Sequence, residues 1–174
     1  MITVLTGGAR SGKSAYAVEL GRRHQGPVLF MATAPPLDDD MKARIARHVS
    51  ERPDWPTVEE PFDIAPTIRT ATSPTLVIVD CLTLWVSNLM WRGNSDSDVE
   101  SIAARLADDL RATSADVILI TNEVGLGVHP ESELGRRYRD LLGRVNQIVV
   151  GVSDRALFMM SGRALVLSPI EDTP

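Results

Sequence analysis

The hydrophobic residues of this chain form short unbroken runs, and longer segments with helical periodicity separate them. Such runs are typical of parallel strands buried on both faces. We predict strands at residues 2–5, 28–32, 76–79, 117–120, 156–160 and 164–167. Helical patterns cover residues 14–23, 41–52, 82–91, 97–112 and 133–150. The alternation predicts an α/β fold, a three-layer sandwich with helices on both faces of a mostly parallel sheet.

Local signals refine two of these elements and question a third. Residues 161–163 read Ser-Gly-Arg between the last two strands, which predicts a hairpin and therefore an antiparallel edge strand. Ser97 and Glu100 have the spacing of a capping box, so we expect the fourth helix to begin there. Gly143 is a candidate interruption of the last helix.

Length and composition predict one domain, residues 1–174, because the predicted loops at 53–61 and 92–98 are too short for linkers. A net charge of −5 argues against nucleic-acid binding. No apolar stretch approaches 18 residues and the N-terminus lacks a basic leader, so we expect no membrane span and no secretory signal. The single cysteine, Cys81, is compatible with a reducing cytoplasm.

Residues 7–14 read GGARSGKS between the first predicted strand and the first predicted helix. This is the G-x-x-x-x-G-K-[ST] phosphate loop, or Walker A motif, in its proper context. Its glycines allow backbone N–H groups to surround phosphates; Lys13 would reach the β- and γ-phosphates, and Ser14 would bind Mg²⁺. We therefore predict a nucleoside triphosphate site that contains Gly7, Gly8, Ala9, Arg10, Ser11, Gly12, Lys13 and Ser14.

Asp80 directly follows the apolar strand predicted at 76–79, which is the Walker B arrangement. We predict that its carboxylate holds Mg²⁺ directly or through water; the alternative is an ordinary helix cap. The adjacent Cys81 is interpreted as a buried small residue rather than a nucleophile. The chain lacks the D-x-x-G and N-K-x-D motifs of Ras-like GTPases, so we do not expect that class.

His48 lies in the basic segment predicted as a helix at 41–52, beside the apolar stripe of Met41, Ile45 and Val49. One interpretation is a packed or partly exposed side chain. The other is a nucleophile, because neutral imidazole can form an energetic phosphoramidate that passes its group onward. Spacing alone leaves both interpretations open.

Several segments occur in an order that resembles one known family. They are GGARSGKS at 7–14, RIARHVSERPDW at 44–55, Glu59, DCLTLWVSNL at 80–89, and TNEVGLGVHPESELGRRYRDLLGRVNQ at 121–147. Together they resemble the bifunctional adenosylcobinamide kinase / adenosylcobinamide-phosphate guanylyltransferase family of cobalamin biosynthesis. The resemblance covers essentially the whole chain.

The resemblance implies a RecA-like P-loop fold, a homotrimer and two reactions. The first transfers phosphate from ATP or GTP to adenosylcobinamide. The second transfers GMP from GTP to adenosylcobinamide phosphate through a guanylyl-histidine, at the position matching His48. The implied catalytic residues are then His48, Lys13 and Asp80. Implied GTP contacts beyond the phosphate loop are Ala32, Thr33, Ala34, Val49, Ser50, Glu51, Arg52, Glu59 and Asp80. Glu60 is an alternative to Glu59.

Two other functions remain open. One is a monofunctional P-loop kinase of a small metabolite, with a structural His48, and the other is a non-enzymatic nucleotide switch.

Asn122 and Glu123 would contact a ligand or cap their loop. Trp85 and Trp91 are expected to be core or subunit contacts rather than corrin-stacking residues. Arg136, Arg137 and Arg139 would form a solvated helix face, or else face a phosphate or another subunit.

Overall fold

The computed structural model of the chain describes residues 1–35, 39, 50 and 52–169. Seven strands form one sheet in the order β3-β2-β4-β5-β1-β6-β7. All neighbouring pairs are parallel except β6 and β7, which are antiparallel. The strands are β1 (Ile2–Gly7), β2 (Val28–Ala32), β3 (Thr57–Glu59), β4 (Leu76–Asp80), β5 (Asp116–Ile120), β6 (Arg155–Met160) and β7 (Arg163–Leu167).

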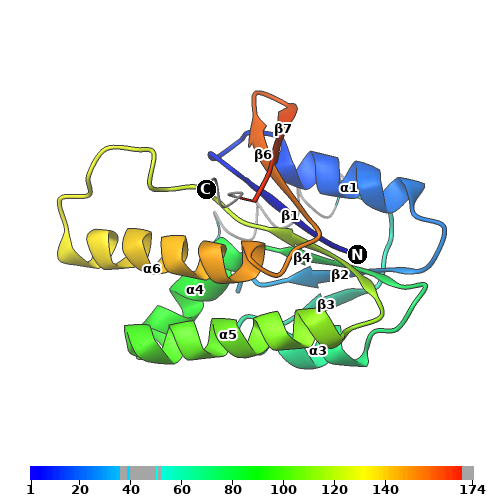
Figure 1. The fold of residues 1–174 in the computed structure, drawn as a ribbon, viewed down its shortest axis with the longest axis horizontal. Helices are drawn as coiled ribbons and strands as arrows, with labels where there is room; N and C mark the ends of the chain where they lie inside the picture. Colours follow the sequence, from blue (N-terminus) through cyan, green and yellow to red (C-terminus); the bar gives the residue numbers. More distant parts are fainter. Residues whose placement is uncertain (36–38, 40–49, 51, 170–174) are drawn as a thin grey trace, which may run out of the picture.

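Helices cover both faces of the sheet. They are α1 (Lys13–Arg23), α3 (Ala65–Thr70), α4 (Leu82–Trp91), α5 (Asp96–Ala112) and α6 (Glu133–Val150). Figure 1 shows α1 on one face and α3, α4, α5 and α6 on the other. The predicted three-layer sandwich, with a mostly parallel sheet and an antiparallel edge strand, is therefore confirmed.

Two apolar cores explain the unbroken hydrophobic runs. In β1, Val4 belongs to the core that contains the buried side chains of α4, α5 and α6. Its neighbour Leu5 belongs to the core beside α1. Successive side chains of a strand point to opposite faces, so a strand covered on both sides must be apolar at every position. Full burial of such a side chain contributes about 1.5–3 kcal/mol.

Two elements were not predicted. β3 is only three residues long, contains one apolar side chain, and pairs with β2 through Met31 and Val58. α3 has six residues and is attached to the larger core by Ile68. Both are short, so they present too little periodic pattern for detection. The helix predicted at 41–52 lies outside the described residues, apart from residues 50 and 52.

The predicted cap at Ser97 is wrong, because α5 begins at Asp96 with Ser95 as its N-cap. The Ser95 Oγ accepts a hydrogen bond from the Asp98 N–H at 3.2 Å, and the Asp98 carboxylate accepts one from the Ser95 N–H at 2.9 Å. The same box spacing therefore occurs two residues earlier, with the shorter acid. The Ser95 hydroxyl also donates to the Asp98 carboxylate at 2.6 Å, and this bond, together with the one from the Ser95 N–H, holds the pKa of Asp98 below its ordinary value. The predicted interruption at Gly143 is also wrong, because α6 is continuous there.

The parallel strands end at one edge of the sheet, where Ala32, Asp80 and Ile120 lie in register. Loops that follow these strands therefore gather there, which is where open α/β sheets bind ligands.

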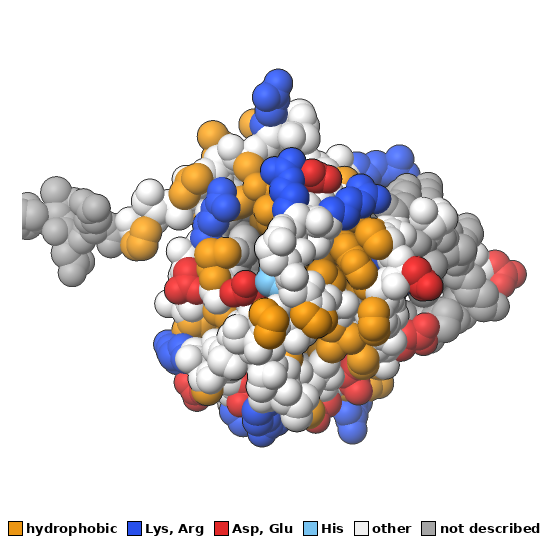
Figure 2. Space-filling model, turned by 90° about the vertical axis from the view of Figure 1, so that its right-hand side faces the viewer, with side chains coloured by type: hydrophobic (Ala, Val, Ile, Leu, Met, Phe, Trp, Pro, Cys, Tyr) orange, Lys and Arg blue, Asp and Glu red, His pale blue; other side chains and the backbone are white. Residues whose placement is uncertain are grey.

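Figure 2 shows a different face, on which Lys, Arg, Asp and Glu side chains are spread among apolar ones. Among the described helices, none combines the length and the apolar character that a membrane crossing requires.

Candidate nucleotide site

The phosphate loop joins β1 to α1, and Lys13 is the first residue of α1. Its ammonium group donates to the carbonyl oxygens of Gly7 at 2.9 Å and Gly8 at 2.6 Å, and to the Ser11 Oγ at 3.2 Å. Lys13 is only 6% exposed. The cation is therefore folded over its own loop, in position to exchange these acceptors for phosphate oxygens.

Two glycines give the loop its shape. A Cβ at Gly7, where φ is +138°, would overlap the Met159 carbonyl oxygen. Gly12 is the N-cap of α1 and has φ of +100°, a value that disfavours other residues. The apex of the loop is also attached to the β6–β7 hairpin, because the Gly162 N–H donates to the Ser11 carbonyl at 3.0 Å. The loop is thus supported by the strand beside it.

Ser14 and Asp80 meet although 66 residues separate them in the sequence. The Ser14 hydroxyl donates to the Asp80 Oδ2 at 3.0 Å, which joins the first turn of α1 to the end of β4. Hydroxyl and carboxylate oxygens are hard donors of the kind that Mg²⁺ prefers. The donor set therefore fits the predicted metal site, with the remaining positions left to phosphate oxygens and water.

Two desolvated cations lie near the Asp80 charge. Burial lowers the pKa of Lys13, while Asp80 acts in the opposite direction. Burial also lowers the pKa of Arg52, again against the Asp80 charge, and the Arg52 guanidinium lies 3.8 Å from the centroid of the Phe30 ring. The Arg52 Nη1 is buried without a hydrogen-bond partner among the described residues. Such a group favours an anionic ligand, because an unpaired buried donor is costly.

Thr33 attaches the segment after β2 to the segment after β4. Its hydroxyl donates to the Cys81 carbonyl at 2.7 Å and accepts from the Cys81 N–H at 2.8 Å. The Asn88 side-chain amide donates to the Thr33 carbonyl at 2.8 Å and to the Pro61 carbonyl at 3.0 Å. Asn88 was not predicted as part of the site. A single amide among the apolar residues of α4 was the available signal, since a buried amide needs partners.

The structure distinguishes Glu59 from Glu60. The Glu60 carboxylate accepts hydrogen bonds from the N–H groups of Phe62 and Asp63, both at 2.8 Å, so it closes its own turn. Glu59 is exposed at the end of β3, in register with Ala32. This arrangement favours Glu59 as the acid available to a ligand.

Other candidate residues separate into three groups. His48, Val49 and Glu51 lie outside the described residues. Asn122 and Glu123 make loop contacts: the Asn122 N–H donates to the Thr83 Oγ1 at 3.0 Å, and the Glu123 carboxylate accepts from the Gly125 N–H at 2.8 Å. The arginines of α6 make contacts within the chain, at Pro130 and Glu131, at Asp96, and at Asp140 and His129.

The two tryptophans of α4 differ. Trp85 is buried and its Nε1–H donates to the Phe62 carbonyl, so the expectation of a core residue is confirmed. Trp91 is 84% exposed, so it is not a core residue of this chain, and a subunit contact stays a prediction for it. It is the last residue of α4, directly after the buried Met90.

Comparisons with known proteins identify one family. A family described as cobinamide kinase / cobinamide phosphate guanyltransferase matches residues 3–167. The bifunctional adenosylcobalamin biosynthesis protein CobU of Escherichia coli is 38% identical over 177 residues, which cover 93% of this chain and 97% of that protein. The bifunctional adenosylcobalamin biosynthesis protein CobP of Pseudomonas aeruginosa is 38% identical over 169 residues, covering 96% of this chain and 97% of that protein.

The fold itself is shared more widely. A prototypical ATPase from the type III secretion system of pathogenic bacteria superimposes with a TM-score of 0.58, over 90% of this chain and 50% of that one, at 12% sequence identity. That likeness concerns the fold alone, and it confirms the P-loop architecture. The family match and the full-length relatives are more specific, and they show that this chain belongs to the cobinamide kinase / cobinamide phosphate guanyltransferase family.

Proposed function

We propose that this chain catalyses both reactions for which its family is named. It phosphorylates adenosylcobinamide with ATP or GTP and then converts adenosylcobinamide phosphate into adenosylcobinamide-GDP with GTP. The observation that carries the proposal is the meeting of Lys13, Ser14 and Asp80 at the edge of the sheet. Phosphoryl transfer depends mainly on positioning and on neutralising charge, and these three residues supply both.

In the first reaction, the hydroxyl oxygen of the aminopropanol arm attacks the γ-phosphorus and the hydroxyl proton passes to solvent. The bond between that phosphorus and the β,γ-bridging oxygen breaks, and the nucleoside diphosphate leaves. Lys13 and the loop N–H groups hold the β- and γ-phosphates. Ser14 and Asp80 would hold Mg²⁺, partly through water, and the ion would reduce the negative charge on the phosphates.

In the second reaction, a ring nitrogen of His48 attacks the α-phosphorus of GTP and pyrophosphate leaves. A phosphate oxygen of adenosylcobinamide phosphate then attacks the same phosphorus, the P–N bond breaks and neutral His48 is restored. One loop can serve both reactions, because the pyrophosphate of the second corresponds to the β- and γ-phosphates of the first. The role of His48 rests on the resemblance of the segment 44–55. The positions of two other implied GTP contacts support this role: Arg52 interacts with the Asp80 charge, and Thr33 bonds Cys81, the residue after Asp80.

The test is incubation with Mg²⁺ and GTP labelled at the α-phosphate, followed by denaturing electrophoresis. We expect acid-labile label on the wild type and none on His48→Ala, because a P–N bond is stable to denaturation but hydrolyses in acid. His129→Ala is the matched control, since His129 lies on an exposed loop and bonds Arg139. It should retain the label.

The outcome also distinguishes the rival function. A wild-type chain that binds GTP and phosphorylates adenosylcobinamide, but never acquires label, would be a monofunctional kinase. His48→Ala should keep the kinase reaction, because the histidine takes no part in transfer of the γ-phosphate.

We also propose that the enzyme works as a homotrimer in the cytoplasm. The resemblance supports the trimer, and the single cysteine is compatible with a reducing compartment. Sedimentation velocity of the purified chain measures the oligomeric state directly.

A further inference from the structure

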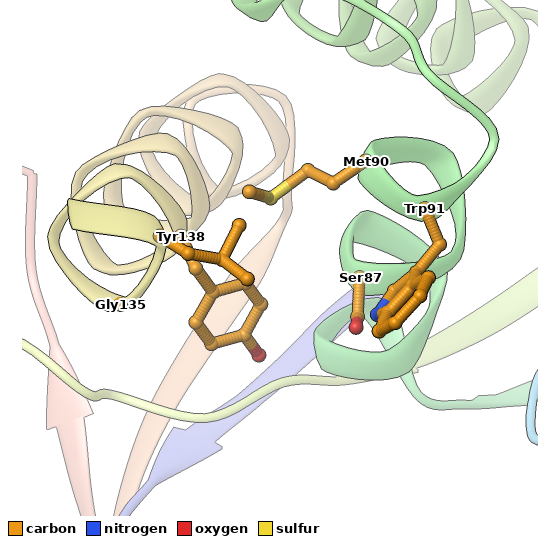
Figure 3. Close-up of a pocket in the computed structure, with 6 residues that line it drawn as sticks. Ser87, Met90, Trp91, Gly135 and Tyr138 are labelled. Carbon is orange, nitrogen blue, oxygen red and sulfur yellow. The ribbon is translucent and has the colours of Figure 1, made fainter. Parts of the chain in front are cut away.

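A pocket of about 390 Å³ opens between the second half of α4 and the first turns of α6. Figure 3 shows Ser87 and Trp91 on α4, with Tyr138 of α6 on the other side of the gap and Met90 reaching across it. The full lining is Ser87, Met90, Trp91, Leu134, Gly135 and Tyr138. The volume lies within the range of small-molecule sites, roughly 300–1,000 Å³.

The pocket combines exposed apolar surface with hydroxyl groups. Trp91 is 84% exposed and Leu134 is 58% exposed, although both border the same concave surface. The hydroxyls of Ser87 and Tyr138 also face it. An exposed indole beside a cavity offers a flat surface against which a conjugated ring can stack.

The pocket is connected to the nucleotide site through the first turn of α4. The Tyr138 hydroxyl donates to the Thr83 carbonyl at 3.2 Å, and the Thr83 Oγ1 accepts from the Asn122 N–H at 3.0 Å. Thr83 follows Asp80 by three residues. Figure 1 shows α4 leaving the sheet at the edge where β4 ends, with α6 beginning at the same end of the molecule. The pocket and the phosphate loop therefore share one edge of the fold.

We propose that this pocket binds the corrin ring of the substrate, with the aminopropanol arm directed along α4 toward the phosphate loop. The inference rests on the proposed function and assigns a place to the larger substrate. Helices rise about 1.5 Å per residue, so Ser87 lies about 9 Å along α4 from Cys81. The arm joins the corrin ring to the reacting hydroxyl through an extended amide chain that also spans about 9 Å, at standard bond lengths.

The chemistry of the lining fits this ligand. A corrin ring has apolar faces, which Trp91 and Leu134 can cover, and a rim of amides, which can bond the Ser87 and Tyr138 oxygens. A second copy of the chain fits less well. A stable interface between proteins needs about 800 Å² from each partner, mostly from a broad surface. Here the exposed apolar side chains surround a concave pocket of small-molecule size.

The test compares Trp91→Ala with Leu165→Ala, which removes an exposed apolar side chain from the distant β7 edge. For Trp91→Ala we expect the KM for adenosylcobinamide to rise about tenfold, as the loss of one aromatic contact implies. The KM for the nucleotide should stay within about twofold. Equilibrium dialysis against adenosylcobinamide should show the same loss of affinity, and Leu165→Ala should behave as the wild type.

Labelling of the protein by GTP without corrinoid separates this inference from the proposed function. That half-reaction needs no corrin ring, so Trp91→Ala should acquire label like the wild type. An unchanged KM and dialysis affinity in a labelled Trp91→Ala enzyme would overturn the corrin site and leave the proposed function standing. A Trp91→Ala chain that binds corrinoid normally but sediments as a smaller species would identify the pocket as a contact between copies.

Discussion

At the scale of single residues, burial competes with charge around the nucleotide site. Lys13 and Arg52 are both desolvated, which lowers the pKa of each, and the Asp80 carboxylate partly offsets that effect. A bound triphosphate would add negative charge beside them, and because both cations are desolvated, their attraction for the phosphates would be stronger than in water.

Cys81 gives a prediction at the same scale. Burial and then the Asp80 charge raise its pKa from 9.0 to about 11, and hydrogen bonds with Thr83 and Leu84 at the start of α4 offset only part of this rise. At pH 8 the thiolate fraction should be about 100-fold smaller than in the unfolded chain. Alkylation by iodoacetamide should therefore be about 100-fold slower in buffer than in urea.

The pH dependence checks the cause. The alkylation rate of the folded chain should increase about tenfold per pH unit between pH 8 and 10 and level off near 11. Because the pKa is raised in the folded state, the neutral thiol contributes stability below pH 9 that is lost as the pH rises toward 11. A rate at pH 8 equal to that in urea would contradict both the raised pKa of Cys81 and its assignment as a non-nucleophile.

At the scale of elements, α6 depends on packing and capping rather than on propensity. The Ser132 Oγ accepts from the Gly135 N–H at 3.1 Å at its start, and Leu141, Leu142 and Val149 anchor it in the core. Ion pairs such as Arg144 with Glu100 join it to α5, but exposed pairs contribute only about 0–1 kcal/mol each. The apolar face therefore accounts for most of its stability.

Gly143 is the weak position within this helix. A Cβ built there meets no atom within 4 Å, so Gly143→Ala should raise the free energy of unfolding by about 0.5–1 kcal/mol. Gly135→Ala is the control, because its Cβ would lie 2.9 Å from both the Pro130 Cβ and the Ser132 Oγ. Urea denaturation should show a gain for the first variant and little or none for the second. A loss at Gly143 would mean that the open space is filled in solution.

At the scale of the whole molecule, the first strand lies inside the sheet between β5 and β6, and the last strand forms its edge. The two ends of the chain therefore contribute to one sheet, and β1 supplies residues to both apolar cores. Disruption of β1 would affect both layers of helices. We consequently expect residues 1–174 to unfold as a single unit.

Calorimetry tests this expectation together with nucleotide binding. The chain should show one thermal transition, and MgATP at 100 times its Kd should stabilise it by about 2.7 kcal/mol, a rise in Tm of roughly 5–11 °C. Lys13→Ala should unfold in one transition but lose most of that rise, because the phosphates lose their main cation. Two separate transitions would contradict the single domain. An equal rise in both proteins would contradict the role of Lys13.

The sequence by itself determined the fold class, the phosphate loop and the acid at the end of β4. These features are encoded locally: an unbroken apolar run predicts a buried parallel strand, and GGARSGKS is a contiguous motif. The family resemblance likewise depended on ordered segments that can be read without coordinates. Short elements with few apolar residues, such as β3 and α3, carried no comparable local signal.

Only the tertiary structure decided which side chains meet. The Ser14–Asp80 bond, the attachment of Thr33 to Cys81 and Asn88, and the exposure of Trp91 all depend on how distant segments pack. The reason is physical. Secondary-structure patterns reflect the needs of a residue and its near neighbours, whereas hydrogen-bond partners, desolvation and exposure arise only when segments dozens of residues apart come into contact.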